Sequence, residues 1–566
     1  MIDLDKSAND QSFAIVHEDI PQTSLQPYLS HTIEECVVLK KSIIADVEPD
    51  LNEQRVSGMD VEQNDVSEFD EKSDIPQMNT VIVDVQSDFK LTDAQKEVVA
   101  ELKACIERCQ LLGFLQGFPG AGKTTTCKKM EDFTRLKALY CGSTGTASAQ
   151  FKSKTINSLL SLGLSVDRID LTTEMTSAQM ISKIVQIVQK FYLILLDEAS
   201  MITPVTLARI DLRLRQCFDP ELPFGGKHFL LVGDMWQFPP VSTLSKPALY
   251  QSAVVVATNK RVPSEAYRAG ANLFTQFKLL VLNEQQRCDK DYADFLAPLR
   301  DTNVQYPITR EWLSKLKVLR NEDVKEQDSP WHFAPVAVTG NVERLTISKF
   351  KAEIFGQRRY EPIVTWLCQV RSGVCGRRTR YAPLDINDSM LDDKYSVLQK
   401  FFVRGAPCVL SENLSSVKDL AKGRKGTLES LVWDNSDFVG PVPDLKTLPR
   451  GEISQVPQPR FVLIRVDGEL IPLEYANTKL ENISHRKSTV NYRDHRFELL
   501  FSVTYHKLQG LTLDALVLSI NKHPNPKLRL TLPSLYVGAS RLHNIDELRV
   551  LPFKKDDADY LITLCL

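Results

Sequence analysis

The chain contains no long apolar run, no regularly spaced cysteine pair and no export signal. None of its hydrophobic runs approaches the ~18 residues of a membrane-spanning helix. Its 11 cysteines are scattered, and the close pairs Cys105/Cys109 and Cys368/Cys375 lack the spacing and the neighbouring histidines of a zinc site. The acidic start lacks both the basic-then-apolar order of a secretion signal and the Arg-rich composition of a mitochondrial presequence. These absences predict an intracellular protein with reduced thiols, nuclear or, if viral or bacterial, cytoplasmic.

The net charge of −3 hides an uneven distribution of charged residues along the 566-residue chain. Residues 1–88 contain 20 acidic and 5 basic side chains, so the remainder has a net charge of +12. With only short apolar islands, this acidic arm is predicted to be mostly disordered and available to a protein partner, although it could instead be the remnant of a further domain. The basic body is compatible with a polyanionic partner and equally with ordinary solvated charge.

Short apolar runs alternate with helical patterns from about residue 89 onwards. Leu91–Leu102 has the apolar spacing of a helix, and Thr92-x-x-Gln95 is its start signal. The short continuous apolar runs that follow this helix are typical of strands in parallel sheets buried on both faces. The predicted strands are Leu111–Gln116, Ala138–Cys141, Leu193–Leu196, Phe229–Val232, Val254–Ala257, Pro335–Val338, Leu516–Ser519 and Leu535–Val537. The turn-rich residues at about 405–500 predict a small β insert, and the pattern as a whole indicates two α/β halves.

Residues 117–124, GFPGAGKT, form a complete GxxxxGK[ST] loop between a predicted strand and a predicted helix. Its glycines allow backbone N–H groups to surround phosphate oxygens. Lys123 would reach the β- and γ-phosphates, and the Thr124 hydroxyl would bind Mg²⁺. The predicted nucleotide-binding residues are Gly117, Gly120, Gly122, Lys123, Thr124 and Thr125.

Two further strands end in polar residues that complement this loop. The strand at 193–196 runs into Asp197, a second Mg²⁺ ligand, and Glu198, the candidate general base for an attacking water. The strand at 229–232 runs into Gly233, Asp234 and, after Trp236, Gln237, which could bond a γ-phosphate or its water. Trp236 could stack a base or pack in the core. The C-terminal ends of parallel strands form a ligand crevice, so these residues are expected to meet there.

In their order, these motifs resemble the superfamily 1 DNA helicases of the RecD-like, petite-integration-frequency (Pif) type, and the resemblance spans about 90–555. The PFGG segment at 223–226 is typical of that family. The segment KTINSLL at 154–160 resembles its TIHSLL-like motif, with Asn157 where histidine is usual. GAPCVL at 405–410, with Asn413 and the glycines at 423–427, resembles another. The resemblance implies that Arg287 and Arg541 reach the nucleotide, with Arg541 as an arginine finger.

The same resemblance implies further contacts to ATP and to single-stranded DNA. Gln95 would contact adenine, although Thr92-x-x-Gln95 is also a capping box that fixes a helix start. The implied DNA-binding residues are Thr144, Gly145, Trp236, Thr339, Asn341, His506 and Lys507. Arginines near Tyr381 (Arg371, Arg377, Arg378 and Arg380) form either a DNA-tracking patch or a solvated loop. His485, Arg486 and Lys487 fall in the β insert, which would be SH3-like.

We therefore expect an α/β fold of two RecA-like P-loop domains with parallel sheets. Residues 1–88 would be the acidic arm, 89–275 the first domain with a small wedge insertion near 160–180, and 276–566 the second, interrupted by the β insert at about 430–500. The implied function is ATP- and Mg²⁺-dependent unwinding of DNA in replication, repair or recombination by a monomer acting on single-stranded and forked DNA, with 5′ to 3′ polarity.

Three alternatives remain open. A helicase-like ATPase from a mobile element or virus could bind nucleic acid without unwinding it. A P-loop ATPase could remodel a protein through the acidic arm, and a viral RNA helicase is a further variant. Stimulation of ATP hydrolysis by single-stranded DNA would separate the helicase from the protein remodeller, and strand displacement would separate it from a binding protein.

Overall fold

The computed structural model describes residues 35–36 and 90–564, apart from 150, 152, 163–176, 241–247, 252–264, 301–303, 327, 373–395, 413, 415–419, 421, 435–442 and 481–489. Several expectations therefore lie outside the described residues: almost all of the acidic arm, most of the wedge insertion near 160–180 and the strand Val254–Ala257. The same holds for Asn413, the arginines at 377–380 with Tyr381, and residues 485–487.

The first half contains a five-stranded parallel sheet in the order β2-β3-β4-β1-β5. Its strands are β1 (Leu112–Gly117), β2 (Ala138–Gly142), β3 (Leu193–Asp197), β4 (His228–Gly233) and β5 (Lys278–Leu282). The accompanying helices are α2 (Asp93–Arg108), α3 (Lys123–Lys128), α4 (Met130–Thr134), α5 (Gly145–Ala149), α6 (Ile156–Leu159), α7 (Ala178–Val188), α8 (Pro204–Cys217) and α10 (Glu265–Phe274). β3 is buried along its whole length, as the continuous apolar runs predicted.

The second half contains a four-stranded parallel sheet in the order β18-β6-β19-β20. Its strands are β18 (Ser502–Thr504), β6 (Val336–Val338), β19 (Leu516–Leu518) and β20 (Leu548–Val550). Around it lie α11 (Lys290–Leu296), α12 (Arg310–Ser314), α13 (Asn341–Arg359), α15 (Leu532–Ala539) and α16 (Lys555–Ile562). The mixed α/β fold with two parallel sheets agrees with the expected pair of RecA-like domains.

The strand predicted at Leu535–Val537 is wrong, because these residues lie within helix α15. Thr531 caps this helix by accepting a hydrogen bond from the Ser534 N–H, and a proline occupies its first turn. The apolar run misled the prediction because α15 is buried nearly all round. A helix and a strand that are both fully buried have the same uniform composition.

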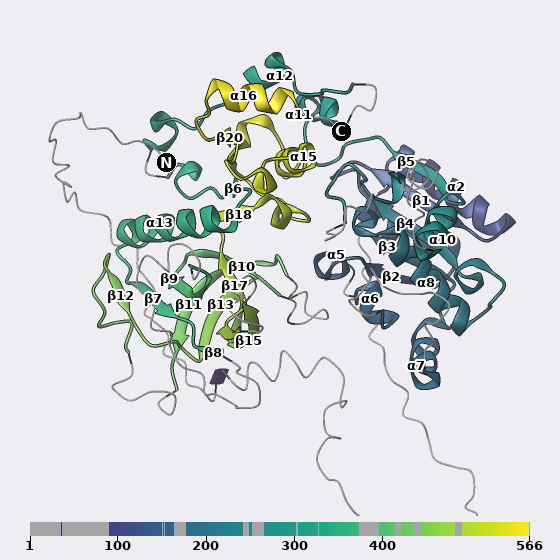
Figure 1. Cartoon of the computed structure of the whole chain (residues 1–566), viewed down its shortest axis with the longest axis horizontal. Coiled ribbons are helices and arrows are strands. Elements are labelled where there is room, and N and C mark those ends of the chain that lie inside the picture. Colours follow the sequence, from purple (N-terminus) through teal and green to yellow (C-terminus); the bar gives the residue numbers. More distant parts are fainter. Residues whose placement is uncertain are drawn as a thin grey trace, which may run out of the picture.

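Between α13 and β18 lie the strands β7 to β17, which are drawn in green in the lower left of Figure 1. They are β7 (Ile363–Leu367), β8 (Val370–Ser372), β9 (Gln399–Phe402), β10 (Pro407–Leu410), β11 (Lys425–Val432), β12 (Ile453–Gln455), β13 (Phe461–Val466), β14 (Glu469–Glu474), β15 (Ala476–Leu480), β16 (Val490–Asp494) and β17 (Phe497–Leu499). Five of them form an antiparallel sheet in the order β14-β13-β11-β10-β17.

Two predicted boundaries cut across hydrogen-bonded strands and are corrected by the pairing. A boundary at 275/276 would detach β5 from β1, with which it pairs in parallel. An insert beginning at about 430 would detach β10 and most of β11 from β13 and β17. Both errors arose because turn residues mark loops and do not reveal strand partners. The division into functional domains otherwise stays a prediction.

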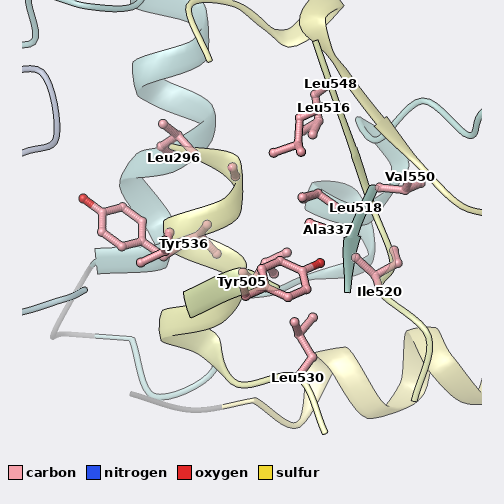
Figure 2. Close-up of a cluster of buried hydrophobic side chains, with 14 of the residues drawn as sticks. Leu296, Ala337, Tyr505, Leu516, Leu518, Ile520, Leu530, Tyr536, Leu548 and Val550 are labelled. Atoms are coloured by element: carbon pink, nitrogen blue, oxygen red, sulfur yellow. The ribbon is translucent and has the colours of Figure 1, made fainter. Parts of the chain in front are cut away.

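The largest hydrophobic cluster surrounds the second sheet (Figure 2). Leu516 and Leu518 of β19, together with Val550 of β20, pack there against Tyr536 of α15 and Leu296 of α11. Helix α11 therefore belongs to the core of the second half, although it follows β5 of the first half directly. Among the described residues, no helix is both long and apolar enough to cross a membrane.

Candidate functional site

The phosphate-binding loop joins β1 to α3 in a conformation that depends on glycine. Gly120 and Gly122 have φ values of 88° and 78°, which side chains other than glycine rarely adopt. A Cβ at Gly120 would lie 2.4 Å from Cβ of Arg287. Lys123 Nζ donates to the carbonyls of Gly117 and Phe118 at 2.9 and 2.8 Å, and burial lowers its pKa. Thr124 and Thr125 follow in the first turn of α3, which aims its N–H groups into the loop.

Gln95 takes part in the capping box of α2 and also contacts the phosphate-binding loop. Its side-chain carbonyl accepts from the Thr92 N–H at 3.1 Å, and the Thr92 hydroxyl accepts from the Gln95 N–H, so the capping box is present. Its amide nitrogen also donates to the Ala121 carbonyl of the phosphate-binding loop at 3.2 Å. A Cβ at Gly122 would lie 2.2 Å from that nitrogen. The side chain therefore lies directly against the loop, and contact with adenine stays a prediction.

Substituting Gln95 and Thr92 separately should distinguish adenine contact from capping. Each alanine variant loses half of the capping box, which should lower the free energy of unfolding by about 1 kcal/mol. Only Gln95→Ala removes the amide that faces the loop, so we expect about a tenfold rise in KM for ATP there alone. The measurements are chemical denaturation and steady-state ATPase kinetics. Equal KM values in the two variants would assign Gln95 to capping alone.

Asp197 is the last residue of β3, and Glu198 follows it and contacts the second half of the molecule. Glu198 has the unusual φ of 55°, and its N–H donates to the Asp197 carboxylate at 2.8 Å. A residue held in this region of φ indicates a constraint imposed by its surroundings. The Glu198 carboxylate accepts from Gln509 Nε2 at 3.0 Å, so the candidate general base is held by the segment after β18. The contact between Gln509 and Glu198 was not foreseen from the sequence.

The stability of the nucleotide-free protein should depend on pH through Asp197. Burial and then the Glu198 carboxylate raise the pKa of Asp197 from 3.8 to about 7. Between these values the folded state retains a proton that the unfolded chain releases, so this contribution to stability is lost as pH rises towards 7. In a chelator, Asp197→Asn should therefore unfold at a higher temperature than the unmodified protein at pH 8. The difference should shrink towards pH 5 in thermal unfolding, and a constant difference would contradict the shift.

Asp234 and Gln237 lie at the end of β4 and are both buried. The Asp234 carboxylate accepts from Gln116 Nε2 at 3.0 Å, from Arg300 Nη2 at 3.2 Å and from the Tyr536 hydroxyl at 2.8 Å. The backbone N–H of Gln237 donates to the Asp234 carbonyl. Its side-chain carbonyl has no hydrogen-bond partner among the described residues, so an acceptor remains open in the junction. Neither Arg300 nor the hydroxyl of Tyr536 was foreseen from the sequence.

The two predicted arginines lie together opposite the phosphate-binding loop. Arg541 is 3% exposed and donates to the Val537 carbonyl and the Ser540 hydroxyl, both at 2.8 Å. Arg287 donates to the Ser540 carbonyl at 3.4 Å. Burial and then Arg287 lower the pKa of Arg541 to about 10, and burial lowers that of Arg287. Neither guanidinium forms an ion pair with a described carboxylate. Glu198 and Asp234 act on Arg541 only without a direct ion pair, and two neighbouring cations in this state suit a polyanion.

The residues predicted to bind DNA lie at or near the C-terminal ends of parallel strands in both sheets. Half-buried Thr144 and Gly145 follow β2, and Trp236 follows β4. Thr339 and Asn341 follow β6, and His506 and Lys507 follow β18. Their shared location is that of ligand crevices in open α/β sheets, and DNA contact stays a prediction.

Three of these side chains have partners within the protein. Trp236 is half-buried against the second-sheet core, with its ring centroid 6.3 Å from that of Tyr250. The exposed ring of His506 stacks on Phe238 at 4.1 Å between centroids. Lys507 Nζ donates to both oxygens of Glu498 at 2.6 Å. Trp236 thus combines core packing with an accessible part of its ring, and any phosphate would compete with Glu498 for Lys507.

A phosphate-binding loop on one parallel sheet, with Arg287 before α11 and Arg541 after α15, is the arrangement of a P-loop nucleotide hydrolase with two RecA-like domains. Residues 90–306 match the family model described as PIF1-like helicase. The ATP-dependent DNA helicase Pif1 of Bdellovibrio bacteriovorus is 22% identical over 440 residues, which cover 77% of this chain and 83% of that protein. The protein of the same name from Campylobacter jejuni is 22% identical over 462 residues, covering 78% and 89%.

Solved structures of this group share the fold. Bacteroides Pif1 bound to single-stranded DNA superimposes with a TM-score of 0.54 at 19% identity, covering 83% of this chain and 94% of that one. Pif1 helicase from Candida albicans gives a TM-score of 0.52 at 18% identity, covering 83% and 97%. The chain is thus similar in sequence to PIF1-like helicases over residues 90–306, and it shares the fold of the solved Pif1 structures.

Proposed function

We propose that this chain is an ATP-dependent DNA helicase that couples ATP hydrolysis to movement along single-stranded DNA and to duplex separation. The observation that carries this proposal is a pair of arginines beside the phosphate-binding loop, buried Arg541 and half-buried Arg287, neither of which forms an ion pair with a described carboxylate. A nucleotide's phosphates would supply the missing negative charge. Because the loop belongs to one RecA-like domain and Arg541 to the other, nucleotide binding would draw the two domains together.

Hydrolysis would use groups already held in place. Lys123 would turn from the loop carbonyls to the β- and γ-phosphates, and Glu198, oriented by Gln509, would accept the proton of the attacking water. The open side-chain carbonyl of Gln237 would accept a hydrogen bond from that water. Arg541 would stabilise the charge that grows on the γ-phosphate in the transition state.

Thr124 and Asp197 have the chemistry needed to hold Mg²⁺. A hydroxyl at the start of α3 and a carboxylate at the end of β3 are hard oxygen ligands of the kind that Mg²⁺ prefers. A cation there would also offset the burial that raises the pKa of Asp197. When bound, Mg²⁺ would neutralise phosphate charge, and the protein would contribute these two oxygens to its coordination.

The DNA strand would cross the crevices at the C-terminal ends of both sheets. Closure of the cleft around ATP and its relaxation after hydrolysis would change the distance between the two sets of contacts and so move the strand. Forked DNA is the proposed substrate, 5′ to 3′ the proposed polarity and a monomer the proposed acting form. Roles in repair or recombination, a nuclear location and a partner for the acidic arm remain predictions.

Stimulation of ATP hydrolysis by single-stranded DNA tests this proposal. We expect the steady-state rate with saturating ATP to rise at least about tenfold on adding a mixed-sequence DNA oligonucleotide. An RNA oligonucleotide of the same sequence provides the matched comparison for the viral RNA helicase alternative. A steady-state ATPase rate that neither DNA nor RNA raised would favour the alternative of an ATPase that remodels a protein partner.

A further inference from the structure

Arg300 lies outside every motif that the sequence singled out, at the end of the short 3-10 helix Ala297–Arg300. This helix follows α11, and its Leu299 belongs to the second-sheet core. The Arg300 side chain nevertheless contacts the first RecA-like domain twice. Its Nη2 donates to Asp234 at 3.2 Å, and its Cζ lies 3.6 Å from the ring centroid of Phe118 in the phosphate-binding loop. Arg300 thus reaches from the second domain into the first.

The Asp234 carboxylate is fully buried, and Arg300 is the only cation paired with it among the described residues. A buried carboxylate needs hydrogen-bond donors on both oxygens. Arg300 and Gln116 supply one oxygen, and the Tyr536 hydroxyl supplies the other. In Figure 2 the hydroxyl of Tyr536 points away from the other labelled side chains of the cluster. Asp234 therefore joins β4 of the first domain to two elements of the second.

These two elements are fixed to each other. The Tyr292 hydroxyl of α11 donates to the Ala539 carbonyl of α15 at 2.6 Å, and both side chains lie in the same core. Helix α11 is flanked by Arg287 and Arg300, and α15 carries Tyr536 and leads into Arg541. A displacement imposed on Arg300 would consequently reach Arg541 through packed, hydrogen-bonded elements.

The other end of this connection, Phe118, is hydrogen-bonded to the lysine that would bind the phosphates. The Phe118 carbonyl accepts a hydrogen bond from Lys123 Nζ at 2.8 Å. If Lys123 leaves this carbonyl for a phosphate, the carbonyl keeps only its hydrogen bond from the Ala121 N–H at 3.1 Å, while the Phe118 ring remains against Arg300. The Arg300 side chain is only 10% exposed, so it cannot follow such a change through solvent. Its Nε makes no hydrogen bond to any described residue and could gain one when the loop rearranges.

We propose that Arg300 is a positioning residue that links the phosphate-binding loop, through Asp234 and Tyr536, to the helix before Arg541. The inference rests on the proposed function and adds a residue to it. Arg300 contacts Phe118 and Asp234 rather than the reacting atoms. Its loss should therefore separate nucleotide binding from the response to DNA while leaving nucleotide affinity largely intact.

The test compares Arg300→Gln with Arg310→Gln, a matched change at an arginine of α12 whose side chain is 81% exposed. For Arg300→Gln we expect the Kd for ATP to stay within about threefold, and the DNA-stimulated kcat to fall about tenfold or more. In the unmodified protein, we expect the affinity for single-stranded DNA to differ between the ADP-bound form and the form bound to a non-hydrolysable ATP analogue. In Arg300→Gln this difference in affinity should shrink about tenfold as well. Arg310→Gln should match the unmodified protein in all three measurements.

Two further variants distinguish a positioning role from a merely structural one. Arg300→Lys should recover only part of the coupling, because an ammonium can pair with Asp234 but lacks a planar face for stacking on Phe118. Tyr536→Phe removes one hydroxyl from the same carboxylate. Its effect on kcat should be smaller in an Arg300→Gln background than alone, as expected when two residues act through one junction.

A folded Arg300→Gln variant with unchanged DNA-stimulated kcat and an unchanged difference in DNA affinity would overturn the inference. If that variant does not fold, Phe118→Leu removes the stacking and preserves the ion pair, and coupling equal to that of the unmodified protein would overturn it as well. Failure of the proposed function has a different signature, because the unmodified chain would then show no stimulation by DNA at all.

Discussion

Replacing Lys123 with alanine is expected to abolish DNA-stimulated ATP hydrolysis, with kcat falling by about 10³-fold or more. The lysine is half-buried in the loop, and its ammonium is held by the carbonyls of Gly117 and Phe118. Lys123 can exchange these neutral carbonyls for a phosphate at little cost. A carboxylate partner would instead compete with the phosphate for the ammonium. No other cation donates to these two carbonyls among the described residues. ATPase turnover at saturating single-stranded DNA is the measurement.

Lys128→Ala provides the matched control for Lys123→Ala. Lys128 lies in the same helix, α3, but its side chain is exposed and faces away from the loop carbonyls. Its removal should leave turnover within about twofold, since surface substitutions usually change little. Circular dichroism and thermal unfolding should show both variants folded. Retained turnover in folded Lys123→Ala would remove this loop from the mechanism.

Arg541→Ala should preserve ATP binding and lose hydrolysis, with kcat reduced by about 10³-fold. Arg541 is buried, and its pKa of about 10 keeps it charged at neutral pH. Its hydrogen bonds to the Val537 carbonyl and the Ser540 hydroxyl hold the guanidinium in place before any nucleotide arrives. Preorganised charge of this kind acts on the transition state more than on the bound ground state.

The control for Arg541→Ala is Arg358→Ala, an exposed arginine in the last turn of α13. Equilibrium binding of a fluorescent ATP analogue should give a Kd within about threefold for both variants, and single-turnover hydrolysis should separate them. An unchanged single-turnover rate in Arg541→Ala would exclude this residue as the arginine finger. A large loss of ATP affinity would assign it to binding instead.

The nucleotide-binding loop and the first sheet could be predicted because their signals are local. GxxxxGK[ST] fixes its own conformation through glycines at 120 and 122, and strands β1 to β4 are short apolar runs bounded by polar residues. The second half was harder to predict from the sequence, because α15 has the uniform apolar composition of a buried strand. The partners Arg300, Tyr536 and Gln509 could not be found from the sequence, since their contacts join residues 66 to 311 positions apart.

The PFGG segment has a structural role that its sequence did not reveal. Phe224 has a φ of 51°, its N–H donates to Asp211 of α8, and its ring stacks on Phe229 of β4 at 4.3 Å. A Cβ at Gly225 would lie 2.5 Å from the Leu214 carbonyl. The segment therefore fixes α8 against β4, whose end carries Asp234 and Gln237. Its sequence indicated the family, and its geometry shows how it supports the junction.

Strand displacement on DNA duplexes with a single 5′ or 3′ overhang tests the central claim most directly. The unmodified protein should separate the 5′-overhang duplex in an ATP-dependent reaction and leave the 3′-overhang duplex intact, and Lys123→Ala should separate neither. ATP hydrolysis stimulated by these DNAs without displacement of either strand would contradict the claim. It would identify the chain as a nucleic-acid-binding ATPase that does not unwind DNA.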